Sequence, residues 1–203
     1  MSLHQTSPHD DETGKKLGMW LFLYTEIILF GGLFVLYAVY LTVHTEDFVE
    51  GGKQLDRLFG LANTVILLIS SFAVAASITA VQKSQKGVAL GSLAASLLCG
   101  LIFLINKYFE WGHKFEIGLY PNSERLLDGP TGQNIFFGLY YVITGLHGIH
   151  IVIGMTVLAV AMAYVQAGKI TPTRFALLEN AGLYWHLVDL IWIFIFPLFY
   201  LII

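Results

Sequence analysis

Five long apolar runs restrict the fold of this chain more than any other feature of its sequence. Each run can cross the ~30 Å hydrocarbon core of a bilayer as a helix that rises about 1.5 Å per residue. Hydrophobic residues make up 56% of the 203 residues and charged residues only 12%, about half the charged share of a soluble domain. We therefore predict an all-α integral membrane protein with five transmembrane helices, at residues 17–43, 58–81, 88–105, 134–165 and 178–203.

The residues around these runs indicate one membrane domain. Residues 1–16 form a polar N-terminal tail, and the length of the first run favours a retained helix over a cleaved signal peptide. Residues 17–203 then form a single five-helix domain without internal repeats. The one cysteine, Cys99, excludes an intrachain disulfide, and a net charge of −3 gives no sign of nucleic-acid binding.

The loop cations predict the orientation in the membrane. The tail and the second and fourth loops hold Lys15, Lys16, Lys83, Lys86, Lys169 and Arg174. The longer first and third loops hold Lys53, Arg57, Lys107, Lys114 and Arg125. Because lysine and arginine concentrate on the cytoplasmic side of membrane proteins, six cations against five favour a cytoplasmic N-terminus and a periplasmic C-terminus.

A carboxylate, Glu26, lies inside the first apolar run, nine residues from its start. The helical rise places it roughly 13 Å into the span, near the middle of the membrane. An ionised carboxylate at that depth costs at least ~2.5 kcal/mol, so we expect it to be protonated or paired. His150, near the midpoint of the fourth run, and His186, eight residues into the fifth, lie at a similar depth.

The histidines and a second acidic residue occur in pairs three residues apart, so that His147 shares a helix face with His150, and His186 with Asp189. A carboxyl and an imidazole at one depth can satisfy each other's hydrogen bonds where water is absent. We therefore predict that these four residues and Glu26 form or flank one buried polar network, with Glu26 contacting His147 or His150.

Two other interpretations of this network are a haem site and a metal site. Bis-histidine haem ligation usually needs histidines on facing helices in repeated pairs, and only His147 or His150 could face His186. A metal could bind two histidines with Glu26 and Asp189, but flat apolar helices give it no aqueous approach. We favour a network that holds helices together and can exchange a proton, and we assign no catalytic, cofactor-binding or metal-ligating residue.

Small residues at helical spacing predict where helices pack closely. Ser92, Ser96 and Gly100 repeat every four residues in the third run, and Gly145 and Gly148 lie beside the histidines of the fourth. In lipid, small residues let two backbones approach, because packing rather than the hydrophobic effect drives helix association. We expect these five residues to make helix contacts.

Five motifs, in this order, resemble subunit III of the haem–copper oxidases in its short five-helix bacterial form. The first, WLFLYTEIILFGGLF at 20–34, is similar to the helix of that family that bears a glutamate within the membrane, with Glu26 at that position. The others are NTVILLISS at 63–71, NKYFEW at 106–111, TGLHGIH at 144–150 and YWHLVDLIWIFIFPLFY at 184–200. The resemblance implies a bundle equivalent to helices III–VII of oxidase subunit III.

The resemblance also implies a function. The chain would be a cofactor-free accessory subunit of a proton-pumping terminal oxidase in the respiratory chain of a bacterial cytoplasmic membrane. It would contact subunit I directly, stabilise it during turnover and support its proton supply, with haem and copper in partner subunits. Subunit II, other subunits, membrane lipids including a bound phospholipid, and a respiratory supercomplex are the other implied partners. The longer family members have two further N-terminal helices that form one wall of a lipid cleft.

Two alternatives stay open at this point. An accessory membrane protein of a nitric oxide reductase system would share the five-helix pattern, and co-purification would separate the two. A free-standing transporter or cytochrome belongs to another class. Transporters usually have inverted repeats and helices broken near the membrane midplane, and neither occurs here. The sequence does not decide between cytochrome c and a quinol as electron donor.

Overall fold

The computed structural model describes residues 8–202 and contains seven helices in that range. Residues 1–7 of the expected polar tail and residue 203 of the last expected span lie outside it. The helices are α1 Pro8–Val43, α2 Thr45–Lys53, α3 Arg57–Gln82, α4 Lys86–Glu116, α5 Glu124–Leu127, α6 Thr131–Gln166 and α7 Ala176–Tyr200. The described residues contain no strand, only an isolated β-bridge between Thr171 and Arg174.

Five of these helices, namely α1, α3, α4, α6 and α7, are long and apolar enough to cross a membrane. The all-α fold with five membrane-spanning helices is therefore confirmed. Two helix bounds differ clearly from the apolar runs. The first helix begins at Pro8 rather than at residue 17, and α4 continues to Glu116 rather than ending at residue 105. Hydropathy marks where a helix is apolar, and both extensions are polar segments that are still helical.

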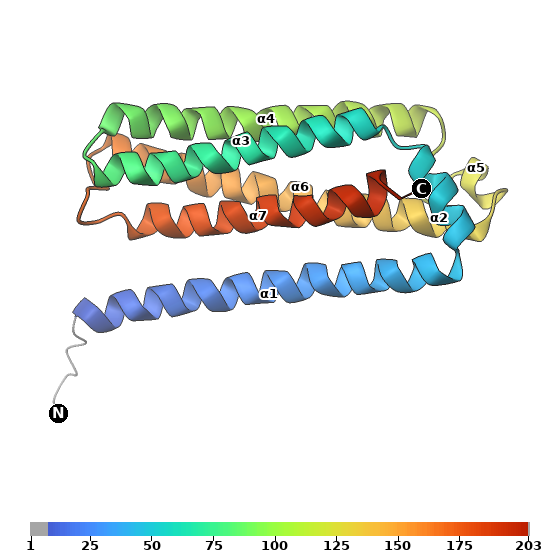
Figure 1. The fold of residues 1–203 in the computed structure, drawn as a ribbon, viewed down its shortest axis with the longest axis horizontal. Coiled ribbons are helices and arrows are strands. Elements are labelled where there is room, and N and C mark those ends of the chain that lie inside the picture. The colour runs from blue at the N-terminus through green and yellow to red at the C-terminus, as the bar shows by residue number, and fades with distance from the viewer. Residues whose placement is uncertain (1–7, 203) are drawn as a thin grey trace.

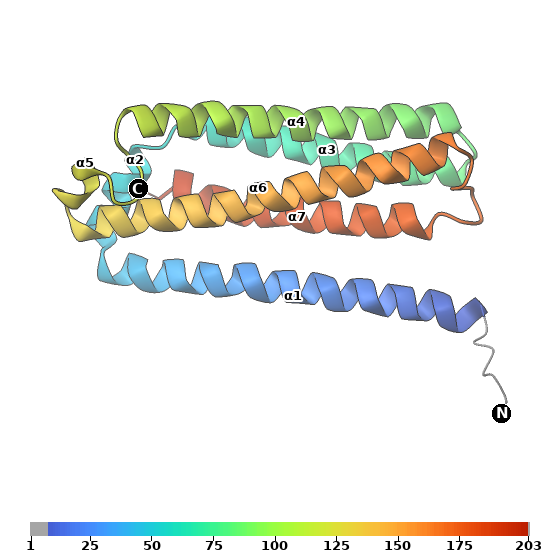
Figure 2. The same ribbon diagram turned by 180° about the vertical axis from the view of Figure 1, so that it is seen from behind.

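Helices α3, α4, α6 and α7 form a four-helix bundle (Figure 1). Neighbours around the bundle are α3 with α4, α4 with α6, α6 with α7 and α7 with α3. The first helix lies outside this bundle and contacts α6 and α7, as both views show (Figures 1 and 2). The short helix α2 packs across one end of the bundle, against α6.

Local signals in the sequence explain several helix ends. The Asp56 carboxylate accepts hydrogen bonds from the backbone N–H groups of Leu58 (2.8 Å) and Phe59, and so caps the start of α3. Gly118 and Gly168 follow α4 and α6 with φ values of 73° and 71°. This left-handed conformation is typical of the residue that ends a helix, and glycine adopts it without steric cost.

The first helix is much less buried than the others. Only 11% of its most apolar stretch is buried inside the chain, against 56% for α7. Its buried side chains lie on one stripe that includes Leu23, Phe30 and Tyr37. On its other side Tyr24 is 61% and Val35 65% exposed. Apolar side chains gain little from leaving lipid, so α1 can remain stable at the edge of the bundle.

The expected small-residue contacts differ from one another. Ser96 is buried and its hydroxyl lies 2.7 Å from that of Ser70, whereas Ser92 is half-buried. A Cβ on Gly100 would lie 3.0 Å from Trp185, and one on Gly145 would lie 3.2 Å from Trp111, so both glycines permit close packing. Gly148 departs from the expectation. No atom lies within 4 Å of a Cβ built there, because the residue opens onto a groove rather than a neighbouring helix.

The close approach of α6 to α7 gives a first testable prediction. An added Cβ at Gly154 would lie 2.7 Å from Cε3 of Trp185. That indole is fully buried, and its N–H donates to the Ser70 hydroxyl at 3.0 Å, so it has little freedom to move. We expect Gly154→Ala to lower the free energy of unfolding by ~1–3 kcal/mol, measured by thermal denaturation in detergent.

Gly138→Ala is the matched control, since a Cβ at this position of α6 meets nothing within 4 Å. It should leave stability unchanged or raise it by up to ~1 kcal/mol, because alanine favours a helix over glycine. Equal losses in the two variants would contradict the close packing of Gly154 against Trp185.

Candidate functional site

Glu26 of α1 and His150 of α6 form a direct hydrogen bond between the outlying helix and the bundle. The distance from His150 Nε2 to Glu26 Oε2 is 2.7 Å, and the two side chains are only 10% and 13% exposed. The Phe30 ring packs edge-on against the imidazole, with ring centroids 5.2 Å apart. Of the two histidines expected as partners of Glu26, the structure therefore places His150 against it.

The other nitrogen of His150 limits where protons can lie in this pair. His150 Nδ1 is 2.7 Å from the backbone carbonyl oxygen of Leu146, which can only accept, so Nδ1 carries a hydrogen. Nε2 then either accepts a hydrogen bond from a protonated Glu26 or donates one to its carboxylate. Both arrangements have zero net charge and differ only in the position of one proton. The pair can therefore hold and exchange a proton without placing a net charge inside the membrane.

His186 makes a separate contact on the α3 side of α7. Its Nδ1 lies 2.6 Å from the hydroxyl of Ser71 in α3. Its side chain also lines a cavity of about 350 Å³ with Lys16, Trp20 and Glu179. No hydrogen bond in the described part of the chain links His186 to Glu26 or His150. This imidazole therefore joins α7 to α3 rather than to the pair on α1 and α6.

His147 and Asp189 are buried without hydrogen-bond partners among the described residues. The His147 ring packs between two aromatic rings, with centroid distances of 5.5 Å to Phe103 and 5.2 Å to Trp192. The structure thus brings Glu26 and His150 together, and no hydrogen bond among the described residues joins His147, His186 or Asp189 to that pair. Spacing along a helix gives which residues are neighbours on its surface, but does not give the rotation of one helix against another.

A second polar cluster, which the sequence did not predict, joins α4, α6 and α7. We call Lys107, Glu110, Tyr140 and Tyr200 the Lys107 cluster. The Lys107 ammonium donates three hydrogen bonds of 2.9 Å, to the Glu110 carboxylate and to both tyrosine hydroxyls. The hydroxyls of Tyr140 and Tyr200 in turn donate to Glu110, at 2.8 and 2.6 Å. All three N–H groups of the lysine are used, so the cluster is saturated and holds the helices together.

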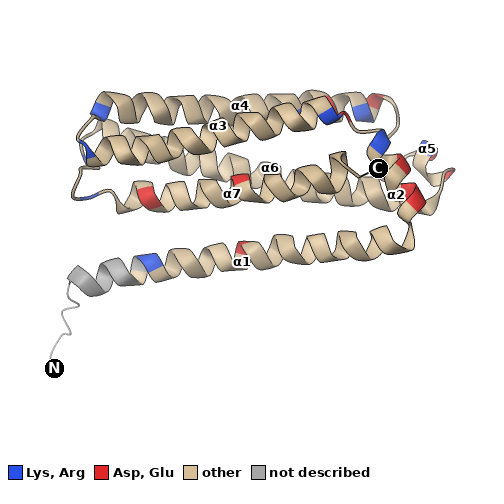
Figure 3. Cartoon of the chain, in the orientation of Figure 1, with Lys and Arg blue, Asp and Glu red and all other residues tan. Residues whose placement is uncertain are grey.

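One signal for this cluster is present in the sequence. Lys107 and Glu110 are three residues apart in NKYFEW, a spacing that places opposite charges on one helix face. Their tyrosine partners come from helices far along the chain, and only tertiary structure brings them in. Nearby on α4, the Lys114 ammonium donates to the backbone carbonyl of Gln54, just beyond α2. Charged residues elsewhere in the described part of the chain lie mainly toward the two ends of the bundle, as the coloured ribbon shows (Figure 3).

The described residues contain no group of three or more histidine, cysteine, aspartate or glutamate side chains placed to hold a metal ion. The imidazoles of His150 and His186 are also separately engaged, one with Glu26 and one with Ser71. The chemistry that these polar groups support is proton exchange at Glu26 and His150, and helix attachment elsewhere.

The Glu26–His150 contact can be tested by a double-mutant cycle. We expect Glu26→Leu and His150→Leu each to lower the free energy of unfolding by ~1–3 kcal/mol, because each leaves a buried polar partner unsatisfied. The double variant should lose about 1 kcal/mol less than the sum. Thr25→Leu is the control for Glu26→Leu, since its exposed hydroxyl bonds only to the Phe22 carbonyl of its own helix. Additive losses from Glu26→Leu and His150→Leu would contradict the pairing.

The Lys107 cluster gives another prediction. Lys107→Met leaves the buried Glu110 carboxylate without its cation and should cost ~3–5 kcal/mol in chemical denaturation. Lys107→Met combined with Glu110→Leu should be more stable than Lys107→Met alone, because no uncompensated charge stays buried. A double variant as unstable as the sum of the single variants would show that the ion pair is not the organising contact.

The chain matches one protein family over almost its whole length. The family model described as Cytochrome c oxidase subunit III covers residues 4–202. The Cytochrome bo(3) ubiquinol oxidase subunit 3 of Pseudomonas putida is 30% identical over 197 residues, 96% of this chain and 88% of that protein. The Cytochrome c oxidase subunit 3 of Synechocystis is 32% identical over 189 residues, 93% and 76% of the two chains. The Heme-copper oxidase subunit I+III of Aeropyrum pernix is 29% identical over 195 residues, 92% of this chain and 22% of that protein. The resemblance predicted from the motifs is thus confirmed, and the chain belongs to the cytochrome c oxidase subunit III family.

Proposed function

We propose that this chain is the cofactor-free accessory subunit III of a proton-pumping haem–copper terminal oxidase in a bacterial cytoplasmic membrane. The family match carries the proposal, because it includes all five membrane-spanning helices. In this role the chain does not reduce oxygen itself. Haem and copper lie in partner subunits, and the chain takes part in respiratory electron transport only through the assembled complex.

Direct contact with subunit I is the central part of the proposal. The Aeropyrum relative is a subunit I+III, so in that protein the two subunits are parts of one chain. Here α1 has a long apolar face that the chain leaves uncovered, with Tyr24 and Val35 among its most exposed residues. A catalytic subunit can cover such a face without any change in the bundle. Subunit II, further subunits, membrane lipids and a supercomplex are the other partners that the family resemblance implies.

Support of the proton supply to subunit I is assigned to Glu26 and His150. Their hydrogen bond holds one proton that can move between oxygen and nitrogen with no change in net charge. Ionisable groups inside a membrane are costly and commonly mark proton pathways. The relatives include both a ubiquinol oxidase and a cytochrome c oxidase subunit, so the role proposed here concerns proton supply and stability rather than the choice of electron donor.

We also propose a cytoplasmic N-terminus and a periplasmic C-terminus. Six cationic residues belong by sequence to the end of the bundle that holds the N-terminus, and five to the opposite end. Two of these five, Lys107 and Lys114, are buried and bonded within the chain. Without these two residues, three loop cations count for the C-terminal end against six for the N-terminal end. This larger difference favours a cytoplasmic N-terminus more strongly, because lysine and arginine concentrate on the cytoplasmic side.

The proposal predicts the behaviour of an oxidase complex that lacks this chain. Affinity purification through a tag on the chain should recover a haem-containing partner with oxygen-reducing activity. Deletion of the chain should leave the initial rate of oxygen consumption by the partner largely intact, but the rate should decay faster during continuous turnover. Oxygen uptake followed over many turnovers measures both quantities.

Re-expression of the wild-type chain is the control and should restore the slow decay. Loss of all activity at the first turnover would assign a catalytic role to the chain and contradict the proposal. Recovery of the chain with a nitric oxide reductase, or without any haem protein, would also contradict it.

A further inference from the structure

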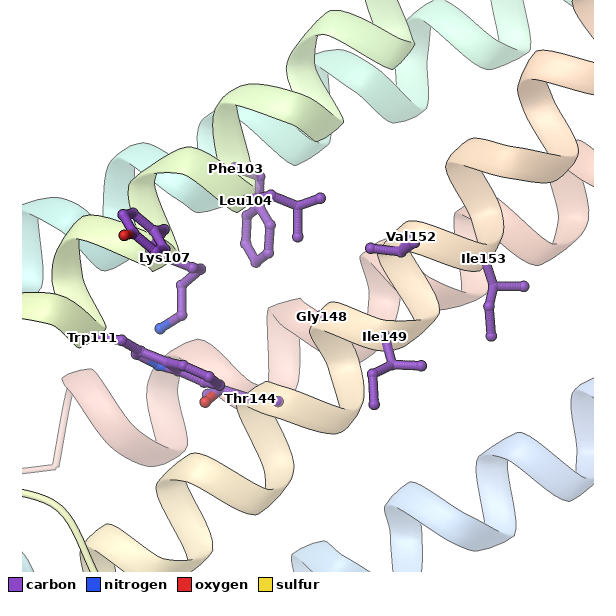
Figure 4. Close-up of a pocket in the computed structure, with 11 residues that line it drawn as sticks. Phe103, Leu104, Lys107, Trp111, Thr144, Gly148, Ile149, Val152 and Ile153 are labelled. Carbon is purple, nitrogen blue, oxygen red and sulfur yellow. The ribbon is translucent and has the colours of Figure 1, made fainter.

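Two of the cavities on the bundle differ in their chemistry. The cavity between α4 and α6, about 410 Å³, is lined mainly by apolar side chains such as Phe103 and Val152 (Figure 4). The Lys107 ammonium at this cavity has all three hydrogens committed to other side chains. A cavity of about 350 Å³ among α1, α3 and α7, which we call the polar cavity, has a different lining. Its polar lining residues include Lys16, Glu179, Asn180 and His186.

The polar cavity reaches from the membrane boundary into the bundle. Lys16 directly precedes the first apolar run, and Glu179 lies in the first turn of α7. His186 follows on the same helix and lies roughly 10 Å deeper than Glu179, at a rise of about 1.5 Å per residue. The volume of the cavity is sufficient for several water molecules, and charged side chains of both signs line it. Water can therefore reach the His186 ring from the N-terminal end of the bundle.

The two ring nitrogens of His186 have different surroundings. Nδ1 lies 2.6 Å from the Ser71 hydroxyl of α3. Nε2 forms no hydrogen bond with any described residue, and the half-buried side chain lines the polar cavity, so Nε2 can bond to water. An imidazole can accept a proton at one nitrogen and release the other hydrogen from the opposite nitrogen. His186 is therefore placed to pass a proton from the cavity to Ser71.

A buried carboxyl lies on the other side of this hydroxyl. Asp189 is 3% exposed, and neither of its oxygens forms a hydrogen bond with a described residue. The Ser71 hydroxyl lies beside this carboxyl as well as beside the imidazole. The thiol of Cys99 in α4 is also near, and no described lysine, arginine or histidine forms an ion pair with Asp189. An ionised carboxylate without a cation or a donor is costly inside a membrane, so Asp189 carries a proton.

A serine hydroxyl can serve both neighbours in turn, because it donates and accepts and rotates about one bond. When Nε2 of His186 takes a proton from cavity water, the hydrogen on Nδ1 can pass to the Ser71 oxygen. The hydrogen that Ser71 already carried then passes to the ionised Asp189 carboxylate. One proton has moved inward, and the imidazole and the hydroxyl are neutral again. The same steps in reverse return the proton to the cavity.

We propose that Asp189 is a proton-exchanging carboxyl that is reached from the N-terminal end of the bundle through the polar cavity, His186 and Ser71. It is separate from the Glu26–His150 pair, since no hydrogen bond among the described residues joins the two groups. Proton exchange at Asp189 needs only groups of this chain and therefore does not depend on the accessory role proposed above. The proposed orientation decides only the side of the membrane, and a cytoplasmic N-terminus makes the cytoplasm the source of the proton.

A purely structural role accounts for the bond between Ser71 and His186 but not for its surroundings. That bond would hold α3 to α7 equally well without water beside it, yet the imidazole lines an open cavity. A buried carboxyl without a partner attaches no helix, and its removal from water costs free energy. Ionisable groups inside a membrane are commonly part of a functional site.

The test measures hydrogen exchange at Asp189 by infrared spectroscopy on the complete resting complex that contains this chain. A protonated carboxyl has a carbonyl stretching band that shifts when deuterium replaces its proton. Subtraction of the spectrum of Asp189→Asn isolates this band from those of other carboxyl groups. We expect the wild type to show the band in ordinary water and to lose it to the shifted position soon after transfer to heavy water.

Ser71→Ala and His186→Phe test the two relay groups. Each should slow the exchange by about 100-fold or more, the usual effect of removing a positioned proton-transfer group. Ser77→Ala is the matched control, because this buried hydroxyl of α3 donates to the Val74 carbonyl of its own helix. It should leave the exchange rate unchanged. Since these variants keep Asp189, their comparison decides the proposal even if Asp189→Asn fails to assemble.

A second pair of variants tests the approach through the polar cavity. Leu183 lines the cavity, so the larger side chain of Leu183→Trp should fill part of it and slow the exchange. Leu190 lies on the same helix, is 48% exposed and does not line the cavity. Leu190→Trp should therefore exchange as fast as the wild type.

Three outcomes would overturn the proposal. Equal exchange rates in the wild type and Ser71→Ala would show that the proton reaches Asp189 by another route. A wild-type band that does not shift in heavy water would make Asp189 a carboxyl that water cannot reach. Absence of the band from the wild type in ordinary water would show that Asp189 is ionised. Because the complex is at rest, these outcomes are independent of whether the chain supports the proton supply of subunit I.

Discussion

Hydrogen bonds between polar side chains are the contacts on which this bundle depends. In lipid an apolar side chain gains little by facing another helix, so composition alone cannot decide which helix lies where. The Lys107 cluster joins α4, α6 and α7 at one end, and the hydroxyls of Ser70 and Ser96 join α3 to α4 further along. Between them, the Trp192 indole donates to Thr64 of α3 at 3.0 Å. A polar contact at several depths thus aligns each helix of the bundle with its neighbours.

The first helix shows what happens where such contacts are few. It is joined to the bundle by the Glu26–His150 pair and by the Tyr37 hydroxyl, which donates to the backbone carbonyl of Leu198. Aromatic packing adds to these, with Tyr37 stacked edge-on against Phe199 at 4.9 Å. Because few polar contacts join the described part of α1 to the bundle, the neutrality of the Glu26–His150 pair matters for structure as well as for proton exchange. A net charge left at this position would weaken the helix that carries the outer face of the subunit.

The sequence predicted the membrane helices well because a span needs only length and apolarity, both of which are local. It also limited the candidate partners of Glu26 to His147 and His150, because helical rise gives the depth of a residue in the membrane without any tertiary information. It could not choose between His147 and His150, since that depends on how α6 is rotated toward α1. The Lys107 cluster was missed for a similar reason. Its lysine and glutamate lie three residues apart in the sequence. Tyr140 and Tyr200, however, belong to two distant apolar runs, in which a tyrosine does not stand out as a polar residue.

In the segment TGLHGIH, about two turns of helix contact three different surroundings. Successive residues of a helix point about 100° apart, so His147, Gly148 and His150 cannot all face the same neighbour. His147 points into the bundle between Phe103 and Trp192, and His150 points to Glu26 on α1. Gly148 opens outward to the groove beside α4. A bulky residue at position 148 would close the groove while leaving both histidines in place.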